Sequence, residues 1–125
     1  MAKPPQDGER TILFKDGTLS GTENYKHGKK SGRAEYWYAN GQKKAEGQFE
    51  KGLFTGEWVW WSENGELRQK GAFVDGQQHG FWQRWYDSGI LMDEGDWVDG
   101  KRSGIWKHYG RDGSLLRTAS YADRS

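Results

Sequence analysis

Three histidines and a surplus of carboxylates and glycines are the features of this sequence that could support catalysis or ligand binding. His27, His79 and His108 stand at three different positions of the repeat described below, whereas a catalytic or metal site needs side chains that converge. The recurring glycines lack the following helix that a phosphate-binding loop requires, so turn geometry explains them better. The absence of cysteine excludes a thiolate metal site. We therefore predict that the protein is not an enzyme and holds no cofactor and no metal.

Side chains suited to binding another protein stand out more clearly. Tyr36, Trp60 and Arg84 are spaced 24 residues apart, and Tyr, Trp and Arg are enriched at binding hot spots. The alternative is that Tyr36 and Trp60 only cover a sheet, since aromatic residues also stabilise strands through cross-strand pairs. The candidate partner-binding residues are Tyr36, Tyr38, Phe54, Trp60, Phe81, Arg84, Tyr86, Asp93, Glu94 and Asp96.

The elements that must position these side chains are tandem repeats of 24 residues. Glycines recur with this spacing in four series. Two series run through the whole chain: Gly8, Gly32, Gly56, Gly80 and Gly104, and Gly17, Gly41, Gly65, Gly89 and Gly113. The other two are Gly28, Gly52, Gly76 and Gly100, and Gly47, Gly71 and Gly95, the last with Glu23 upstream and Ala119 downstream. A fixed period is typical of a repeat array in which each unit stacks on its neighbours.

Large apolar residues keep the same register as the glycines. The first column is Trp58, Trp82 and Trp106, with Ala34 and Arg10 in the earlier copies. The second is Leu13, Trp37, Trp61, Trp85 and Tyr109, and the third is Tyr25, Phe49, Phe73, Trp97 and Tyr121. The fourth is Leu19, Leu67, Leu91 and Leu115, interrupted by Lys43. Because hydrophobic residues make up only 33% of the chain, aromatic rings must supply much of the core.

The repeats divide the chain into a flexible lead-in, residues 1–7 with Pro4 and Pro5, and one repeat domain, residues 8–125. The copies are 8–31, 32–55, 56–79, 80–103 and 104–125. The first and last copies are the least regular, as is usual for the capping units of a repeat array.

Tight-turn signals separate two short strands in each copy. Asn64-Gly65 and Asp75-Gly76 are typical of two-residue type I′ turns, which need positive φ at both central residues. The runs between such turns are rich in aromatic and β-branched residues and lack helical periodicity. The predicted fold class is all-β: an elongated, single-layer antiparallel meander of about ten strands from five β-hairpin repeats.

The first of these turns determines how its hairpin pairs. A two-residue turn sets Ser62 opposite Leu67 and Trp58 opposite Gly71, so that the Trp58 indole lies across the Gly71 backbone. Trp61 then points either to the opposite face or, through a β-bulge, towards the core. We favour the bulge, because a column of large apolar residues indicates burial.

The distribution of charge bears on the kind of partner. A formal net charge of +1 argues against nucleic acid, whose binding proteins usually present a strongly basic face. Residues 26–51 carry seven basic and three acidic side chains, whereas residues 84–100 carry one basic and five acidic ones. The array is expected to be dipolar along its length, which either steers a charged partner or reflects ordinary solvated strand faces.

No apolar run reaches the ~18–20 residues that a membrane span requires. The first ten residues contain no apolar stretch typical of a secretion signal. We therefore expect a cytoplasmic protein without a membrane partner, and the sequence indicates no particular oligomeric state.

The run from Gly71 to Gly80, Gly-Ala-Phe-Val-Asp-Gly-Gln-Gln-His-Gly, resembles the MORN repeat (membrane occupation and recognition nexus). Its continuation through Trp82 and Trp85 to Gly89 is similar to the bacterial MORN variant, in which a Trp stands where the eukaryotic repeat usually has Gly. The resemblance covers residues 8–125 and implies an elongated sheet of stacked hairpins. The departures from the pattern are Glu23, Lys43 and Ala119.

The resemblance also implies a binding role. Proteins similar to the bacterial variant are often encoded beside toxins as presumed antitoxins or immunity proteins, and eukaryotic relatives serve as scaffolds for which lipid binding has been proposed. We expect a protein-binding module, and within that class an antitoxin or immunity protein that neutralises a cognate toxin by direct binding. The alternatives are a scaffold or peripheral lipid-binding protein, and a carbohydrate-binding module, which would require export.

Overall fold

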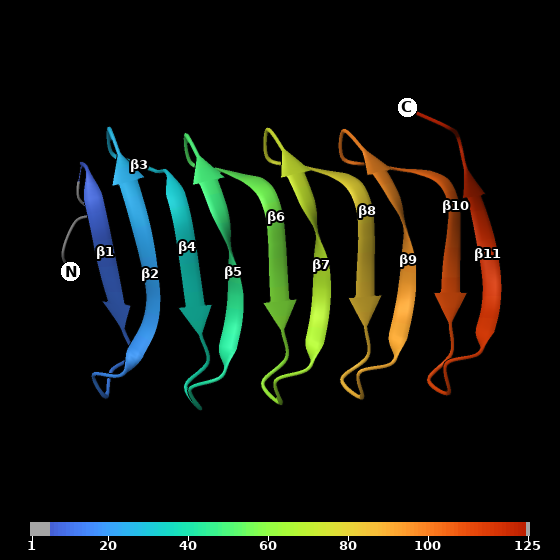
Figure 1. The fold of residues 1–125 in the computed structure, drawn as a ribbon, viewed down its shortest axis with the longest axis horizontal. Coiled ribbons are helices and arrows are strands. Elements are labelled where there is room, and N and C mark those ends of the chain that lie inside the picture. Colours follow the sequence, from blue (N-terminus) through green and yellow to red (C-terminus); the bar gives the residue numbers. More distant parts are fainter. Residues whose placement is uncertain (1–5, 125) are drawn as a thin grey trace.

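The computed structural model describes residues 6–124, and these form one antiparallel sheet (Figure 1). The strands are β1 (Gly8–Leu13), β2 (Leu19–Lys26), β3 (Lys29–Lys30), β4 (Gly32–Trp37), β5 (Lys43–Glu50), β6 (Leu53–Trp61), β7 (Leu67–Val74), β8 (Gln77–Trp85), β9 (Leu91–Val98), β10 (Lys101–Tyr109) and β11 (Leu115–Tyr121). Their order in the sheet follows the sequence, except that the short β3 pairs with β2 alone.

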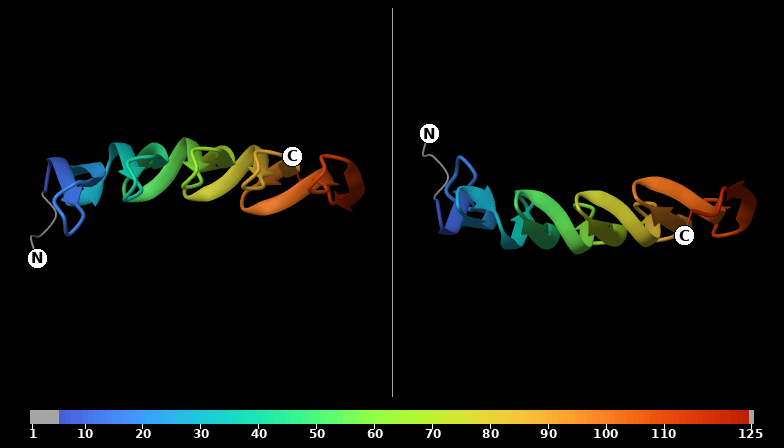
Figure 2. Two further views of the ribbon diagram at one scale, coloured as in Figure 1. Left: turned by 90° about the horizontal axis from the view of Figure 1, so that it is seen from below. Right: turned by 90° about the horizontal axis from the view of Figure 1, so that it is seen from above.

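The sheet is a single twisted layer, much longer than it is thick (Figure 2). Strands β1 and β11 are its two edges, and they lie at opposite ends of the molecule (Figure 1). No residue between 6 and 124 is helical. The predicted all-β, single-layer meander is confirmed, and β3 is the one strand beyond the expected ten.

Strand alternation gives the sheet two different faces. Trp58 and Trp60 point to one side, which we call the tryptophan face, and Val59 points to the other, which we call the polar face. Paired residues share a face, so the register traces one row across each side. The row on the tryptophan face is Ile12, Gly21, Tyr36, Ala45, Trp60, Gln69, Arg84, Asp93, His108 and Arg117. The row on the polar face includes Glu35, Glu46, Val59, Lys70, Gln83, Glu94 and Lys107.

The core lies on the tryptophan face, where each buried indole packs on a glycine. Trp58 and Gly71 are paired in register, as predicted. The predicted contact of the Trp58 indole with Gly71 is nevertheless wrong, because that indole packs on Gly47 of the preceding hairpin. A Cβ atom added at Gly47 would lie 2.2 Å from a Trp58 ring carbon, and one added at Gly71 would lie 2.1 Å from a Trp82 ring carbon.

A bulge in β6 is the reason for this displacement. Gly56 has a φ of 66°, and the pairing of β6 with β5 is interrupted there, opposite Gly47. The bend brings the indole of Trp58 back over β5, where its Nε1–H donates to the carbonyl of Gln48 at 2.9 Å. The indoles of Trp82 and Trp106 make equivalent bonds. Hairpin register alone does not reveal a bend that tilts a side chain towards the other neighbouring strand.

The turns between the strands are of two kinds. Asp75 and Gly76 both have positive φ, at 51° and 80°, which confirms the predicted type I′ turn. At Asn64-Gly65 only the glycine has positive φ, 89°, and the Ser62 N–H donates to the Glu66 carbonyl across a longer loop. The predicted two-residue turn at Asn64-Gly65 is therefore wrong. The Asn64 Oδ1 accepts the Glu66 N–H at 2.9 Å, so the asparagine stabilises the turn through its side chain.

The longer loop produces a β-bulge at the end of the hairpin. Trp60 pairs with Gln69 and Trp61 pairs with Leu67, which leaves Arg68 as the extra residue. The predicted pairing of Leu67 with Ser62 is wrong for this reason. The bulge that we expected near Trp61 is present, but it lies in β7 and leaves the alternation of β6 unchanged.

The column of Trp61 consequently projects from the polar face and not into the core. At the equivalent position in β10, the Tyr109 hydroxyl donates to Glu94 of the polar face at 3.0 Å. In β4, the Trp37 ring lies 5.5 Å from Lys43 Nζ, which bonds the polar-face carboxylates. The expected rotation of Trp61 towards the core does not occur, and the ring is half-buried outside it.

Gln6 and Asp7, the last two residues of the predicted lead-in, are hydrogen-bonded to the turn between β2 and β3. The Gly28 N–H donates to the Gln6 carbonyl at 2.8 Å, and the His27 N–H donates to Asp7 Oδ1 at 3.0 Å. Pro4 and Pro5 lie outside the described residues.

Candidate functional site

A row of chemically different side chains crosses the tryptophan face. The register joins Tyr36 to Trp60 through Ala45, and Trp60 to Arg84 through Gln69. These three candidate residues project from the alternate strands β4, β6 and β8 on the same side, as their 24-residue spacing predicts. Alternate strands lie about 10 Å apart, so the side chains form one continuous strip.

A cleft of about 480 Å³ opens at the aromatic end of this row. It brings together four of the predicted residues, Tyr36, Tyr38, Phe54 and Trp60. Polar residues that the prediction did not include also line it: Ser20, Glu23, Lys30 and Lys44. The cleft therefore offers apolar ring surface together with one carboxylate and two cations, a combination suited to side chains of a peptide or protein.

Glu23 is the buried polar centre of the cleft, with only 3% of its surface exposed. Its carboxylate accepts hydrogen bonds from the hydroxyls of Tyr25 and Tyr36 and lies 3.1 Å from Lys30 Nζ. Burial raises the pKa of Glu23, but the bonds from Tyr36, Lys30 and Tyr25 outweigh it and hold this pKa below its ordinary value. Burial, and then the bond to Glu23, raise the pKa of the Tyr36 hydroxyl. The carboxylate is thus charged and fully engaged at neutral pH.

The sequence contains a signal for this centre, in the form of two linked departures from the repeat. Glu23 replaces the glycine of its column, and Ala34 replaces the tryptophan that would cover it. In the next copy the corresponding residues are Gly47 and Trp58, whose indole lies directly on the glycine. Each departure is visible in the sequence, and the contact between Gly47 and Trp58 at the equivalent positions indicates that the two are linked.

A second cleft of about 280 Å³ lies on the same face at the charged end of the row. Arg84 donates from Nε to Asp93 at 3.0 Å and from Nη2 to the other carboxylate oxygen. Asp93 is only 1% exposed, and its hydrogen bond is the main cause that raises the pKa of Arg84. Arg102 lies over the rings of Trp97 and Trp106, at 5.7 and 4.6 Å from their centroids.

His108 extends the charged end of the row towards the edge of the sheet. Its Nδ1 lies 3.9 Å from Asp93, and its Nε2 is buried without a hydrogen-bond partner among residues 6–124. Burial lowers the pKa of His108, and repulsion from Arg117 lowers it further. The imidazole is therefore neutral at physiological pH.

The remaining predicted residues do not join these clefts. The Tyr86 hydroxyl donates to the Tyr109 carbonyl at 2.8 Å, at the ends of β8 and β10. Phe81, Glu94 and Asp96 stand on the polar face, because they pair in register with residues of that face or alternate with Trp82 and Asp93. The acidic stretch of the sequence is thus divided between the two faces, and Asp93 lies beneath Arg84.

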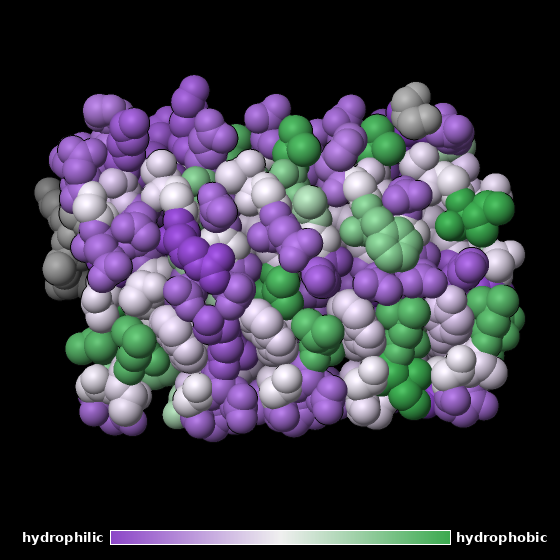
Figure 3. All heavy atoms as spheres, viewed as in Figure 1, coloured by the Kyte–Doolittle hydropathy of each residue, from purple (hydrophilic) through white to green (hydrophobic). Residues whose placement is uncertain are grey.

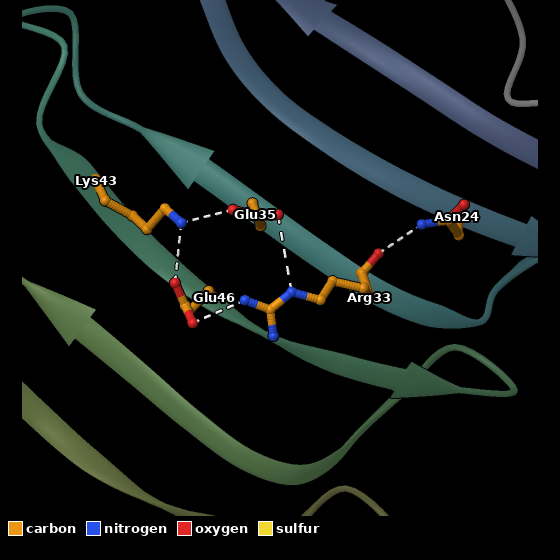
Figure 4. Close-up of polar contacts among 5 residues, drawn as sticks. All are labelled: Asn24, Arg33, Glu35, Lys43 and Glu46. Atoms are coloured by element: carbon orange, nitrogen blue, oxygen red, sulfur yellow. Dashed lines mark hydrogen bonds and ion pairs between the residues drawn. The ribbon is translucent and has the colours of Figure 1, made fainter.

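The polar face carries a network of exposed and half-exposed charges. Lys43 bonds Glu35 and Glu46, and Arg33 bonds Glu46 at 2.8 Å and lies 3.7 Å from Glu35 (Figure 4). The broad face shown in Figure 3 is largely hydrophilic across the middle of the strands. Ion pairs this open to water are each worth about 0–1 kcal/mol, so the network contributes solubility more than stability.

Between residues 6 and 124, no group of three or more His, Asp or Glu side chains is placed to hold a metal ion. None of the described residues forms a helix that is long and apolar enough to cross a membrane. The absence of enzymatic activity stays a prediction.

The comparison with known families supports the repeat. The family model described as the MORN repeat variant matches two segments, residues 30–51 and 54–75. These segments run from β3 to β7 and contain the aromatic cleft residues Tyr36, Tyr38, Phe54 and Trp60. No curated protein matches the chain significantly. Two consecutive segments of the chain thus match the MORN repeat variant, within a sheet that continues on both sides of them.

Proposed function

We propose that the protein is a non-enzymatic binding module for another protein, and that within this class it is a cytoplasmic antitoxin or immunity protein that neutralises a bacterial toxin by direct contact. The coarser statement is supported by the matched family, whose repeats generally act as protein- or lipid-binding modules. The finer statement is supported by the resemblance of the run Gly80 to Gly89 to the bacterial form of the repeat.

The observation that carries the proposal is a row of unlike side chains on a uniform scaffold. Tyr36, Trp60 and Arg84 occupy equivalent positions, and yet they differ in type, whereas the buried indoles next to them repeat. The fold requires the indoles, but it does not require the row to vary from copy to copy. Because the row projects from paired strands, little conformational entropy is lost when a partner binds.

Trp60 has a structural contact as well as a surface that a partner can reach. Its ring stacks on Trp58 at a centroid distance of 5.7 Å and lies 6.1 Å from Trp82. The ring therefore helps to cover the core, as the alternative interpretation expects, while its remaining half lines the cleft. Truncation of Trp60 will cost stability as well as binding, so the test needs a matched control.

The test uses the product of the adjacent gene in the source organism as the candidate partner. We expect Trp60→Ala to weaken binding by at least about 2 kcal/mol, because aromatic residues at the centre of an interface dominate its affinity. The control is Trp85→Ala, which removes an equally large, half-buried ring from the polar face and lines none of the clefts described above. Calorimetric titration gives the affinities, and circular dichroism at the same temperature establishes that both variants are folded.

Two results would count against the proposal. If the folded Trp60→Ala variant binds as tightly as the parent and Trp85→Ala does not, the contact surface is the polar face. If the parent protein does not bind the adjacent gene product, or binds without blocking its toxicity, the antitoxin role is wrong.

A further inference from the structure

Charge is divided between the two faces of the sheet as well as along its length. On the tryptophan face the strands carry two carboxylates, Glu23 and Asp93, among the described residues, and both are buried. Each is already bonded to a cation, Lys30 and Arg84 respectively. The cations of this face include Lys30, Lys44, Arg68, Arg84, Arg102 and Arg117. The tryptophan face is therefore basic, although the whole chain is nearly neutral.

The polar face compensates for this excess. Its carboxylates include Glu35, Glu46, Glu57, Glu94 and Asp96, and its cations include Arg33, Lys43, Lys70 and Lys107. Several of these carboxylates pair with those cations across the strands. A charged partner would thus be drawn to one side of the sheet and repelled or ignored by the other.

Lys44 and Arg68 are the most available cations of the tryptophan face. They occupy the extra position of the β-bulge in β5 and β7, 24 residues apart, and both are exposed. Among residues 6–124 neither lies within ion-pair distance of a carboxylate. Lys44 Nζ lies 5.6 Å from the centroid of the Tyr38 ring, a contact that leaves its charge unneutralised.

These two cations flank an aromatic surface. Lys44 and Arg68 line a small cleft of about 150 Å³ together with Tyr38, Trp60, Trp61 and Gln69. Lys44 also lines the larger cleft of about 480 Å³ between Tyr36 and Trp60. Unpaired cations next to ring faces provide contacts for carboxylates and for apolar or aromatic side chains at the same place.

From this arrangement we propose that the tryptophan face binds an extended, acidic segment of a protein partner, with carboxylates on Lys44 and Arg68 and an adjacent aromatic side chain in the cleft between Tyr36 and Trp60. This inference rests on the proposed protein-binding function and specifies the chemistry of the partner. Charge complementarity supports the acidic character, and the paired Glu23 and Asp93 leave the incoming carboxylates unopposed.

An extended peptide suits this surface better than the other polyanions. A single-stranded nucleic acid needs a charged track that follows many phosphates, and here the cations are separated by ring surface and by buried carboxylates. A bilayer is flat, whereas the sheet twists along its whole length (Figure 2). Side chains of alternating type, spaced along an extended chain, match alternating cations and clefts.

The test measures binding of the full chain to a short fluorescent peptide of Asp and Glu residues with one central Trp. The variant is Lys44→Glu combined with Arg68→Glu, and the matched control is Lys70→Glu combined with Lys107→Glu on the polar face. All four positions are exposed and both pairs change the net charge equally, so only the location of the charge differs. Circular dichroism establishes that both variants fold.

We expect the first pair to weaken peptide binding at least about tenfold and the control pair to change it by less than about twofold. We also expect binding of the parent protein to weaken as salt rises from about 0.05 M to about 0.3 M, since exposed charges are screened. A peptide with Lys in place of the acidic residues is expected not to bind.

The inference is overturned if both variant pairs weaken binding equally, or if the acidic peptide does not bind. It is also overturned if oligothymidine or vesicles containing phosphatidylserine bind more tightly than the peptide and lose this binding in the Lys44 and Arg68 variant. Its failure is distinguishable from failure of the proposed function: if the adjacent gene product still binds and Trp60→Ala still weakens that complex, only the acidic character of the partner is wrong.

Discussion

The contact between the first two hairpins differs from the contacts between the later hairpins. We call each such contact a junction. In the later copies a glycine leaves room and an indole occupies it, as Trp58 does over Gly47. At the first junction the small Ala34 stands at the position of the indole, and the buried side chain of Glu23 stands at the position of the glycine. One junction is therefore held by ring stacking and the other by a buried carboxylate with hydroxyl and ammonium partners.

The difference bears on the position of the cleft at the aromatic end of the row. An indole lies directly on the backbone of its glycine, whereas the carboxylate of Glu23 is held from the side by Lys30 and Tyr36. The polar junction leaves an opening of about 480 Å³ beside it. A departure from the repeat thus coincides with a cleft while the sheet itself continues.

The largest effect is expected from filling a glycine under an indole. Gly71→Val should destabilise the protein by about 3 kcal/mol or more, because even the Cβ atom would lie 2.1 Å from a ring carbon of Trp82. Urea unfolding monitored by tryptophan fluorescence measures the change. The control is Ala72→Val, which enlarges the neighbouring side chain on the polar face and should cost less than about 1 kcal/mol. Equal stability of the two variants would contradict the packing of Trp82 on Gly71.

A double-mutant cycle tests the complementary exchange directly. Glu23→Gly should leave a void and unpaired hydroxyls, and Ala34→Trp should force an indole against the carboxylate, so each single change should destabilise. Together they recreate the later type of junction, and the pair should be more stable than the sum of the single changes by about 2 kcal/mol. Additive free energies of unfolding would show that residues 23 and 34 do not share one space.

A smaller effect is expected from the charge of Glu23. Its pKa in the folded protein lies below the ordinary value of 4.5, so its contribution to stability is complete above that pH and is lost as the pH falls through the folded-state pKa. At neutral pH, Glu23→Gln should cost about 1 kcal/mol, and this deficit relative to the parent should narrow in acid. Thermal unfolding of both proteins across this range measures the gap. A deficit that stays constant with pH would mean that Glu23 contributes through packing and not through its charge.

Local turn chemistry predicted some connections correctly and others not. Asp75-Gly76 forms the type I′ turn because both residues take positive φ. Asn64-Gly65 has a sequence of the same kind but forms a longer loop, in which the asparagine side chain accepts a backbone bond. A dipeptide specifies which conformations its residues tolerate, but the length of the loop also depends on how the flanking strands twist and bulge.

The sequence predicted that the candidate residues form a row on one face, but it did not predict the clefts beside that row. The spacing of Tyr36, Trp60 and Arg84 placed them on one face, because strand alternation carries a fixed period from copy to copy. The spacing did not indicate Lys44 or Arg68 as part of the site, because both are extra residues of bulges whose direction depends on the neighbouring strand. The acidic residues Asp93, Glu94 and Asp96 are close in the sequence but lie on two faces, because successive side chains of a strand alternate.

The sequence by itself determined the period, the strand order and the column of buried tryptophans, since each of these follows from repeated local patterns of glycine and aromatic residues. Tertiary structure alone decided that each buried indole rests on the glycine of the preceding hairpin, that Glu23 is buried with Tyr25, Tyr36 and Lys30 as its partners, and that charge separates by face. These features depend on contacts between strands from adjacent hairpins, and the direction of such contacts is set by bulges and twist, which are properties of the assembled sheet and not of any single strand.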